Sequence, residues 1–242
     1  MRITKKDIYN SFGITYDTKK QHILTPCGWC RPLLKKGNKK LGSNVWTWST
    51  ARTTCPCDCV GCYAKSGHYQ RASVQNSLNR NTELARHYLD FLERALLAQL
   101  ATLPDNTEVR IHAVGDFFCD DYVEMWKRII EANPRKSFWT YTKVRKYEDA
   151  FNDLPNANIV KSFAHNKVNF GHCDHVIALH EELKEAGEKV YICPCGVDDT
   201  KHCEGCGMCS AMDYVLFLEH STAYNAKKDP LYKVFCELVN NQ

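Results

Sequence analysis

Four cysteines stand close together in the stretch CPCDCVGC: Cys55, Cys57, Cys59 and Cys62. Thiolates bind soft metals tightly, so clustered cysteines in a chain without a secretion signal indicate bound metal more than disulfides. Cys55, Cys59 and Cys62 have the spacing C-x3-C-x2-C, which lets one loop hold three irons of a cube-shaped [4Fe-4S] cluster and leaves the fourth iron open to a ligand. Cys57, inside the same loop, leaves a second interpretation of the site open. As a fourth thiolate it would close the site and make it structural, with either iron-sulfur or zinc.

A second group of thiols lies near the C-terminus and consists of Cys193, Cys195, Cys203, Cys206 and Cys209. Two successive C-x2-C steps in this group are typical of a metal site. Zinc would stabilise a segment that has few apolar residues, and an auxiliary iron-sulfur cluster is the other interpretation. Cys27 and Cys30, in CGWC, would add two ligands if the N-terminus folds back. A thioredoxin-like redox pair is less favoured there, because RPLLKKG does not continue as a helix.

Strands and helices that alternate along the chain must position these thiols. We expect a strand at 44–50, which leads into the four-cysteine loop, and a second strand at 108–118, which ends at the turn residues Gly115 and Asp116. Between them the apolar spacing predicts one helix at 81–103, and a helix capped by Asp120 or Asp121 follows. The later expected elements are strands at 137–144, 158–165 and 188–194, a short helix at 146–154, and a helix, or a strand and a helix, at 175–187.

This alternation predicts an α/β fold with a parallel sheet, curled into a partial (β/α) barrel, whose sites gather at the C-terminal ends of the strands. We expect residues 1–192 to form the partial barrel, with an N-terminal extension and the cluster loop 53–63. Residues 193–242 would form a Cys-rich metal-binding segment and C-terminal helices packed on the same domain. The net charge of +4 does not by itself indicate a nucleic-acid binder. No segment resembles a signal peptide or a membrane span, so we expect a cytoplasmic protein without a membrane partner.

Two resemblances follow from these motifs. The C-x3-C-x2-C loop after the first strand and the turn VGDFF after the second resemble the radical S-adenosylmethionine superfamily. The combination of NKKLG, VWTWS, TCP…CYA, YQRASVQNSLNRN, RIHAVGDFF…DYVEMW and FWTYTK, over residues 37–145, resembles the phage-encoded gene product 88 family. The protein would then act in the cytoplasm of the host.

The radical-enzyme resemblance implies that S-adenosylmethionine chelates the open iron and that a reductant supplies an electron. Gly115 and Asp116 would contact the amine of this cofactor, and His112, on the strand that enters the turn, would lie beside it. Tyr141 and Lys143, on the next strand, become candidate catalytic residues through the resemblance alone. Each of these strand side chains is also explained by ordinary packing or solvation. A phage enzyme suggests a nucleotide or nucleic acid as substrate.

This sequence departs from the superfamily pattern at Gly61 and Asp116, and Cys57 is an extra thiol inside the motif. Gly61 stands where an aromatic residue usually precedes the third cysteine, and Asp116 is one methylene shorter than the usual glutamate. The competing hypothesis is therefore a non-catalytic phage protein stabilised by zinc or a closed iron-sulfur site. Such a protein would bind nucleic acid or a protein partner, and it could contact phosphates through the basic residues Arg31, Lys35, Lys36, Lys39 and Lys40.

Overall fold

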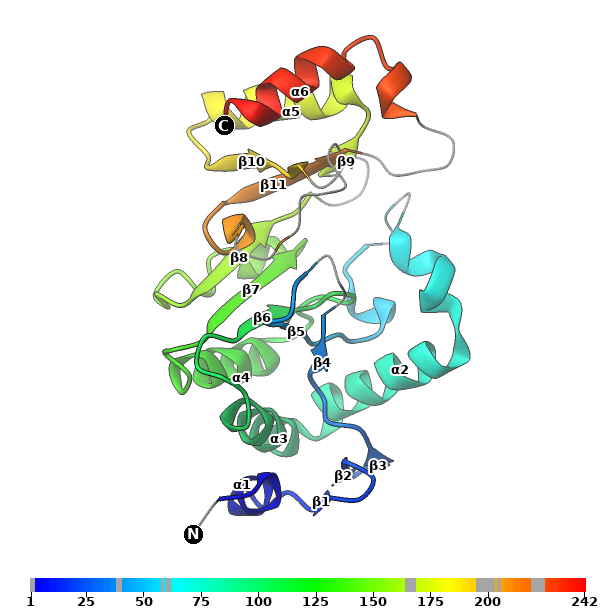
Figure 1. The fold of residues 1–242 in the computed structure, drawn as a ribbon, viewed down its shortest axis with the longest axis vertical. Coiled ribbons are helices and arrows are strands. Elements are labelled where there is room, and N and C mark those ends of the chain that lie inside the picture. The colour runs from blue at the N-terminus through cyan, green and yellow to red at the C-terminus, as the bar shows by residue number, and fades with distance from the viewer. Residues whose placement is uncertain are drawn as a thin grey trace.

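A five-stranded sheet forms the centre of the computed structural model, which describes residues 3–37, 41–57, 59, 62–163, 169–194, 203, 206–218 and 225–242. The strand order is β4-β5-β6-β7-β8, and the four strands from β5 to β8 are parallel, while β4 is antiparallel at the edge (Figure 1). The strands are β4 (Lys35–Lys36), β5 (Val45–Thr47), β6 (Glu108–Ile111), β7 (Ser137–Thr142) and β8 (Ala157–Lys161). The expected strands at 44–50, 108–118, 137–144 and 158–165 are therefore confirmed, with shorter bounds.

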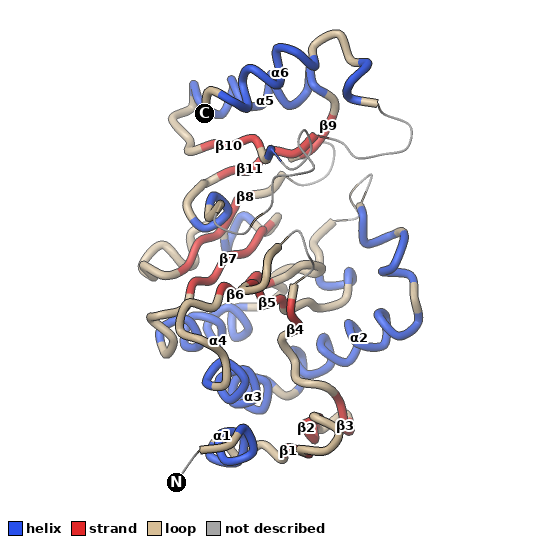
Figure 2. Tube along the Cα trace, in the orientation of Figure 1, coloured by secondary structure: helices blue, strands red, loops and turns tan. Residues whose placement is uncertain are grey.

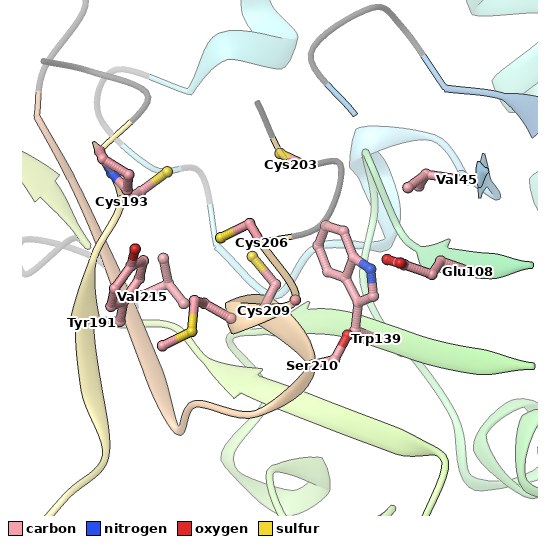
Figure 3. Close-up of a pocket in the computed structure, with 13 residues that line it drawn as sticks. Val45, Glu108, Trp139, Tyr191, Cys193, Cys203, Cys206, Cys209, Ser210 and Val215 are labelled. Carbon is pink, nitrogen blue, oxygen red and sulfur yellow. The ribbon is translucent and has the colours of Figure 1, made fainter. Parts of the chain in front are cut away.

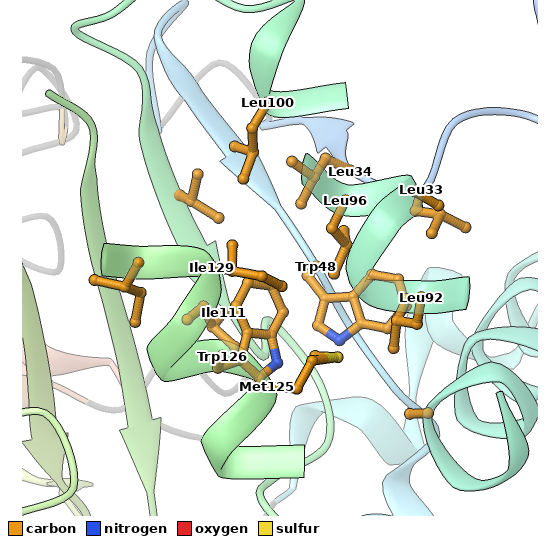
Figure 4. Packing of buried hydrophobic residues seen from close by; sticks show 14 of the residues in the cluster. Leu33, Leu34, Trp48, Leu92, Leu96, Leu100, Ile111, Met125, Trp126 and Ile129 are labelled. Atoms are coloured by element: carbon orange, nitrogen blue, oxygen red, sulfur yellow. The ribbon is translucent and has the colours of Figure 1, made fainter. Parts of the chain in front are cut away.

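Helices cover one face of this sheet. The helices α2 (Ala72–His87) and α3 (Leu89–Ala101) connect β5 to β6, and α4 (Asp120–Glu131) connects β6 to β7. Ile111 of β6 packs with Trp126 and Ile129 of α4 in the main hydrophobic core (Figure 4). Val109 of β6 belongs to the same core. Because side chains alternate along a strand, Glu108 and Arg110 face the opposite side of the sheet.

Three helix predictions need correction. The single helix expected at 81–103 is two helices, because the backbone at Tyr88 leaves the helical region with φ −139° and ψ 48°. The N-cap position of α4 is Cys119, which makes no side-chain capping hydrogen bond, and the expected aspartates are the first two residues of the helix itself. The short helix expected at 146–154 is only a 3-10 turn, η4 (Arg145–Tyr147), followed by hydrogen-bonded turns.

A second sheet extends from the far edge of the first. Its parallel order is β10-β11-β9, with β9 (Phe170–Gly171), β10 (Val190–Ile192) and β11 (Tyr214–Leu218). The Lys161 amide at the end of β8 donates a hydrogen bond of 2.7 Å to the Asp213 carbonyl before β11, so the two sheets meet edge to edge. The helices α5 (Cys173–Glu185) and α6 (Tyr232–Asn240) pack on this sheet (Figure 2).

These contacts refine the expected organisation of the chain. The ambiguous segment 175–187 is one helix, α5, and it shares a hydrophobic core with β10, β11 and α6, so this second core begins well before residue 193. The architecture is a mixed α/β fold with parallel and antiparallel sheets. The strands of the described ranges do not close into a barrel.

The N-terminal segment lies at the end of the molecule opposite to α5 and α6 (Figure 1). It consists of α1 (Lys5–Ser11) and an antiparallel sheet of β1 (Tyr16–Asp17), β2 (His22–Thr25) and β3 (Gly28–Cys30). Over the whole described part of the chain, no helix is long and apolar enough to cross a membrane.

Candidate functional site

The four-cysteine loop and the Gly115–Asp116 turn are in direct contact. The loop leaves β5 through η1 (Arg52–Thr54), and the Thr54 hydroxyl accepts a hydrogen bond of 3.0 Å from the Asp116 amide. Gly115 has a φ of +91°, and a Cβ atom there would lie only 2.0 Å from the Thr50 hydroxyl oxygen. Only glycine therefore lets the turn approach the loop this closely.

Asp116 is a buried carboxylate whose hydrogen bonds come from the protein itself. Oδ1 accepts from the Phe117 amide at 2.8 Å and from the Thr142 hydroxyl at 2.7 Å, and Oδ2 accepts from the Lys143 amide at 2.8 Å. Burial raises the pKa of Asp116 to about 6, although these hydrogen bonds oppose the shift. Asp116 thus ties the end of β6 to the end of β7.

The thiols of the loop influence one another. The Sγ atoms of Cys57 and Cys59 lie 3.2 Å apart. Burial, followed by the charges of Asp116, Cys62 and Cys59, raises the pKa of Cys55 to about 12, while burial and the contact with Cys57 raise the pKa of Cys59 to about 11. Without a metal these two thiols are therefore protonated at neutral pH, and ligation would release their protons.

The described cysteines form no disulfide. Within the described ranges, no group of three or more His, Cys, Asp or Glu side chains is arranged to hold a metal ion. The loop cysteines would therefore have to draw closer together around a cluster. The side chain of Cys62 is anchored against a small hydrophobic core formed by Ala51, Ala64, Leu78 and Val114, which fixes the end of the loop against α2.

The candidate residues on β6 and β7 divide between the two faces of the sheet. His112 is buried on the helical side, where Nε2 lies 2.9 Å from the Tyr122 hydroxyl. Tyr141 faces the other side, and its hydroxyl lies 3.2 Å from Sγ of Cys209. Lys143, at the end of β7, donates a hydrogen bond of 2.6 Å from Nζ to the Phe163 carbonyl, and its charge acts on Cys59. Tyr141 and Lys143 therefore reach the two thiol groups, whereas His112 lies in the core.

Four cysteines of the second group line one pocket beside Trp139 of β7 (Figure 3). Asn158 of β8 fixes this segment, because its side-chain amide donates to the carbonyls of Cys209 and Met212 at 3.0 and 2.9 Å. Cys195 lies outside the described residues. The four cysteines that line the pocket are Cys193, Cys203, Cys206 and Cys209.

Cys27 and Cys30 do not join this group. Cys30 is buried at the end of β3, whose sheet lies at the other end of the molecule from β10 and β11 (Figure 1). Among the charged groups acting on Cys30 are Arg80 of α2 and Lys35 of β4. The condition under which Cys27 and Cys30 would add ligands to the C-terminal thiols, an N-terminus that folds back, is therefore not met in this arrangement.

Sequence reasoning missed Arg110. Its guanidinium lies over the rings of Trp139, at 5.1 Å, and Tyr141, at 5.6 Å, on the sheet face that carries the pocket. The only sequence signal is the alternation of β6, which places a charged residue opposite the buried Val109 and Ile111. Tyr63, directly after Cys62, and Tyr69 also act electrostatically on this guanidinium.

Comparisons with known proteins identify relatives of this chain. The Gene 88 protein of Mycobacterium phage L5 is 36% identical over 93 residues, which cover 35% of this chain and 38% of the length of that relative. No solved structure matches. The family model described as Gene product 88 matches residues 32–229, which is most of the chain and includes both cysteine groups. The chain therefore belongs to the gene product 88 family.

Proposed function

We propose that this protein is an iron-sulfur enzyme of the radical S-adenosylmethionine type, with a [4Fe-4S] cluster on Cys55, Cys59 and Cys62. The observation that carries the proposal is the contact between the cysteine loop after β5 and the Gly115–Asp116 turn after β6. In a parallel sheet, sites form at the C-terminal ends of adjacent strands, where these two segments lie. The consecutive parallel strands β5 to β8, with helices on one face, are compatible with a partial (β/α) barrel.

The donor set suits a cluster with an open iron. Three soft thiols come from one loop, and S-adenosylmethionine would bind the remaining iron and undergo reductive cleavage there. The Gly115 backbone amide acts to lower the pKa of the Cys55 thiol, which would stabilise its thiolate form. Asp116 holds the turn in place, so its role would be to position the Gly115 backbone and to orient Lys143 through the main-chain hydrogen bond. Tyr141 and Lys143 border the site as candidate catalytic groups.

The second thiol group supports a second metal site. Cys193, Cys203, Cys206 and Cys209 line one pocket, and four thiolates suit either zinc or an auxiliary iron-sulfur cluster. A nucleotide or nucleic-acid substrate is part of the proposal. Its support is the family, which includes a phage protein.

One observation favours the competing function, a non-catalytic metal-binding protein. The 3.2 Å separation between the Cys57 and Cys59 sulfurs would let Cys57 act as a fourth ligand and close the first site. Such a protein would bind nucleic acid or another protein. The basic segment gives this alternative limited support, because Lys35 is engaged with the Ser77 hydroxyl at 2.8 Å, and Lys39 and Lys40 lie outside the described residues.

The test is anaerobic purification with iron, sulfide and zinc analysis, followed by electron paramagnetic resonance of the reduced protein. A four-iron signal that changes when S-adenosylmethionine is added supports the enzyme. A cluster that does not respond to the cofactor, or zinc alone, refutes it. Cys55→Ser should abolish the first cluster, while Cys119→Ser, at the start of α4, is the matched control and should retain it.

Cys57→Ser separates the open site from the closed one. If three cysteines hold the cluster, this variant keeps its iron content and its response to S-adenosylmethionine. Loss of the cluster in Cys57→Ser would mean that four thiolates close the site. In that case, binding to nucleic acid that weakens steeply with salt would support the competing function, and salt-insensitive or absent binding would point to a protein partner.

A further inference from the structure

Arg110 places a positive charge on the face of the sheet that carries the thiol pocket. Stacking over Trp139 and Tyr141 holds the guanidinium on this face. The same face of β6 and β7 supplies Glu108 and Trp139 to the pocket lined by the C-terminal cysteines. The guanidinium therefore lies at the border of that pocket.

This guanidinium lacks an acidic partner in the described part of the chain. Its Nε atom is buried without a hydrogen-bond acceptor. Glu108 projects from the same face two residues away, yet none of the ion pairs among the described residues joins it to Arg110. The ionisable side chains that act on Arg110 are Tyr63, Tyr141, Tyr69 and Cys209. Tyrosine is normally neutral at physiological pH, so these rings do not compensate the charge.

Side chains from both thiol segments act on Arg110. Tyr63 follows Cys62 at the end of the first loop, and Tyr141 contacts Cys209 of the second group. Arg110 is partly buried, and a partly buried cation without an anion carries a desolvation cost that binding an anion would offset. The planar fork of arginine matches the paired oxygens of a carboxylate or a phosphate.

We propose that Arg110 binds an anionic group of the substrate, a phosphate or a carboxylate, at the border of the pocket lined by the C-terminal cysteines. The word substrate here rests on the enzyme proposed above, whereas the anion site itself rests on Arg110 and its surroundings. The rival role is a counter-ion for metal-bound thiolates. An anion site is favoured because Nε points to no sulfur acceptor, and Cys209 already has the Tyr141 hydroxyl as a partner.

The experiment follows the arginine Nε–H resonances of the ¹⁵N-labelled full chain while inorganic phosphate or acetate is added over the millimolar range. The resonance of Arg110 is identified by its absence from Arg110→Lys. We expect it to shift saturably. A shift with phosphate alone would indicate that the site binds a phosphoryl group, and a shift with acetate alone would indicate a carboxylate. A shift with both would indicate a site that accepts either anion.

Arg110→Lys keeps the charge but loses the fork, so calorimetry should show binding weakened about tenfold or more. Arg110→Gln should abolish binding, and near-native circular dichroism would show that both variants fold. Arg128→Lys, a surface arginine bonded to Glu93, is the matched control and should bind as the wild type does. An Arg110 resonance that neither anion shifts, or unchanged affinity in Arg110→Lys, overturns the inference.

These measurements are made before and after metal removal with a chelator. Anion binding by a protein that contains no iron-sulfur cluster would retain the Arg110 site and refute the proposed enzyme. A cluster that responds to S-adenosylmethionine, in a protein whose Arg110 binds neither anion, would support the proposed enzyme and refute the Arg110 site. An Arg110 resonance that responds to metal removal but to neither anion would identify the counter-ion role.

Discussion

His112 should make the folded state less stable as the pH falls from 7 to 5. Its imidazole is buried, and burial lowers its pKa to about 3. In the unfolded chain the histidine pKa is about 6.5, so below that pH the unfolded state binds a proton that the folded state does not. The difference favours unfolding throughout the window between the two pKa values. Integrated from pH 7 to pH 5, it amounts to about 2 kcal/mol.

Asp116 contributes in the opposite direction over the same range. Burial raises its pKa to about 6, so the folded state takes up a proton before the unfolded state does, and folding gains about 1 kcal/mol between pH 7 and pH 5. The pH dependence of the wild type alone would mix these effects. The informative quantity is the change in unfolding free energy between the two pH values, compared between the wild type and a variant without the imidazole.

His112→Asn is the suitable variant, because His112 has a φ of +60° and asparagine tolerates this left-handed region. Urea unfolding at pH 7 and pH 5 should show that the variant loses about 2 kcal/mol less stability than the wild type on acidification. His87→Asn, at an exposed site on α2, should lose as much as the wild type. Equal losses in His112→Asn and the wild type would refute the reasoning, since they would mean that the imidazole ionises equally in both states.

Three further substitutions, the first with a matched control, test the packing of the fold by urea unfolding at pH 7. Gly115→Ala and Gly187→Ala both place alanine at a positive φ, but only the first meets an atom, the Thr50 hydroxyl, so it should cost about 1–3 kcal/mol more; equal costs would contradict the close approach. Tyr122→Phe leaves a buried indole N–H and an imidazole nitrogen without their partner and should cost about 1–3 kcal/mol for each group, whereas a neutral effect would contradict this network. Asn156→Ala removes a side-chain amide that donates to three carbonyls around the end of α4, so it should cost about 1–3 kcal/mol, and an unchanged midpoint would contradict that role.

Alternating apolar residues predicted the central strands because these residues report directly on burial. In β6, Val109 and Ile111 point into the core, and this pattern needs no knowledge of the partner strands. The break at Tyr88 could not be found in this way. Leu84 and Leu92 are buried on either side of it, so the apolar spacing continues although the backbone does not. Periodicity identifies the buried face of a helix and says little about the continuity of its axis.

Short strands with distant partners could not be predicted from the sequence, for a related reason. The strand β9 has two residues and pairs with β11, more than forty positions later in the chain. Neither the length nor the composition of such a segment distinguishes it from a loop. The helix α5 was recognised only in part, since the same apolar run suits a strand until its packing against β10 and β11 is known.

The cysteine loop was predictable because its ligand spacing is local, whereas the environment of the loop is not. Sequence spacing placed Gly115 and Asp116 at the end of a strand, and the structure brings them against Thr50 and Thr54. Sequence spacing could not predict that the Asp116 carboxylate accepts hydrogen bonds from the protein itself. Two of the donors lie at the end of β7, twenty-six and twenty-seven residues away. The stacking of Arg110 on Trp139 and Tyr141 of β7 could not be predicted for the same reason, because the partners are far apart in sequence.

The strand β7 links the two thiol groups mechanically. On one face, Thr142 holds the Asp116 carboxylate beneath the first loop; on the other, Tyr141 contacts Cys209 of the second group. Successive residues of a strand point to opposite faces, so a shift of β7 by one residue relative to both β6 and β8 would break both contacts at once. The distance between the first loop and the C-terminal pocket is therefore set by sheet register. A substrate anchored by Arg110 at the border of that pocket would depend on this fixed spacing to reach the first loop.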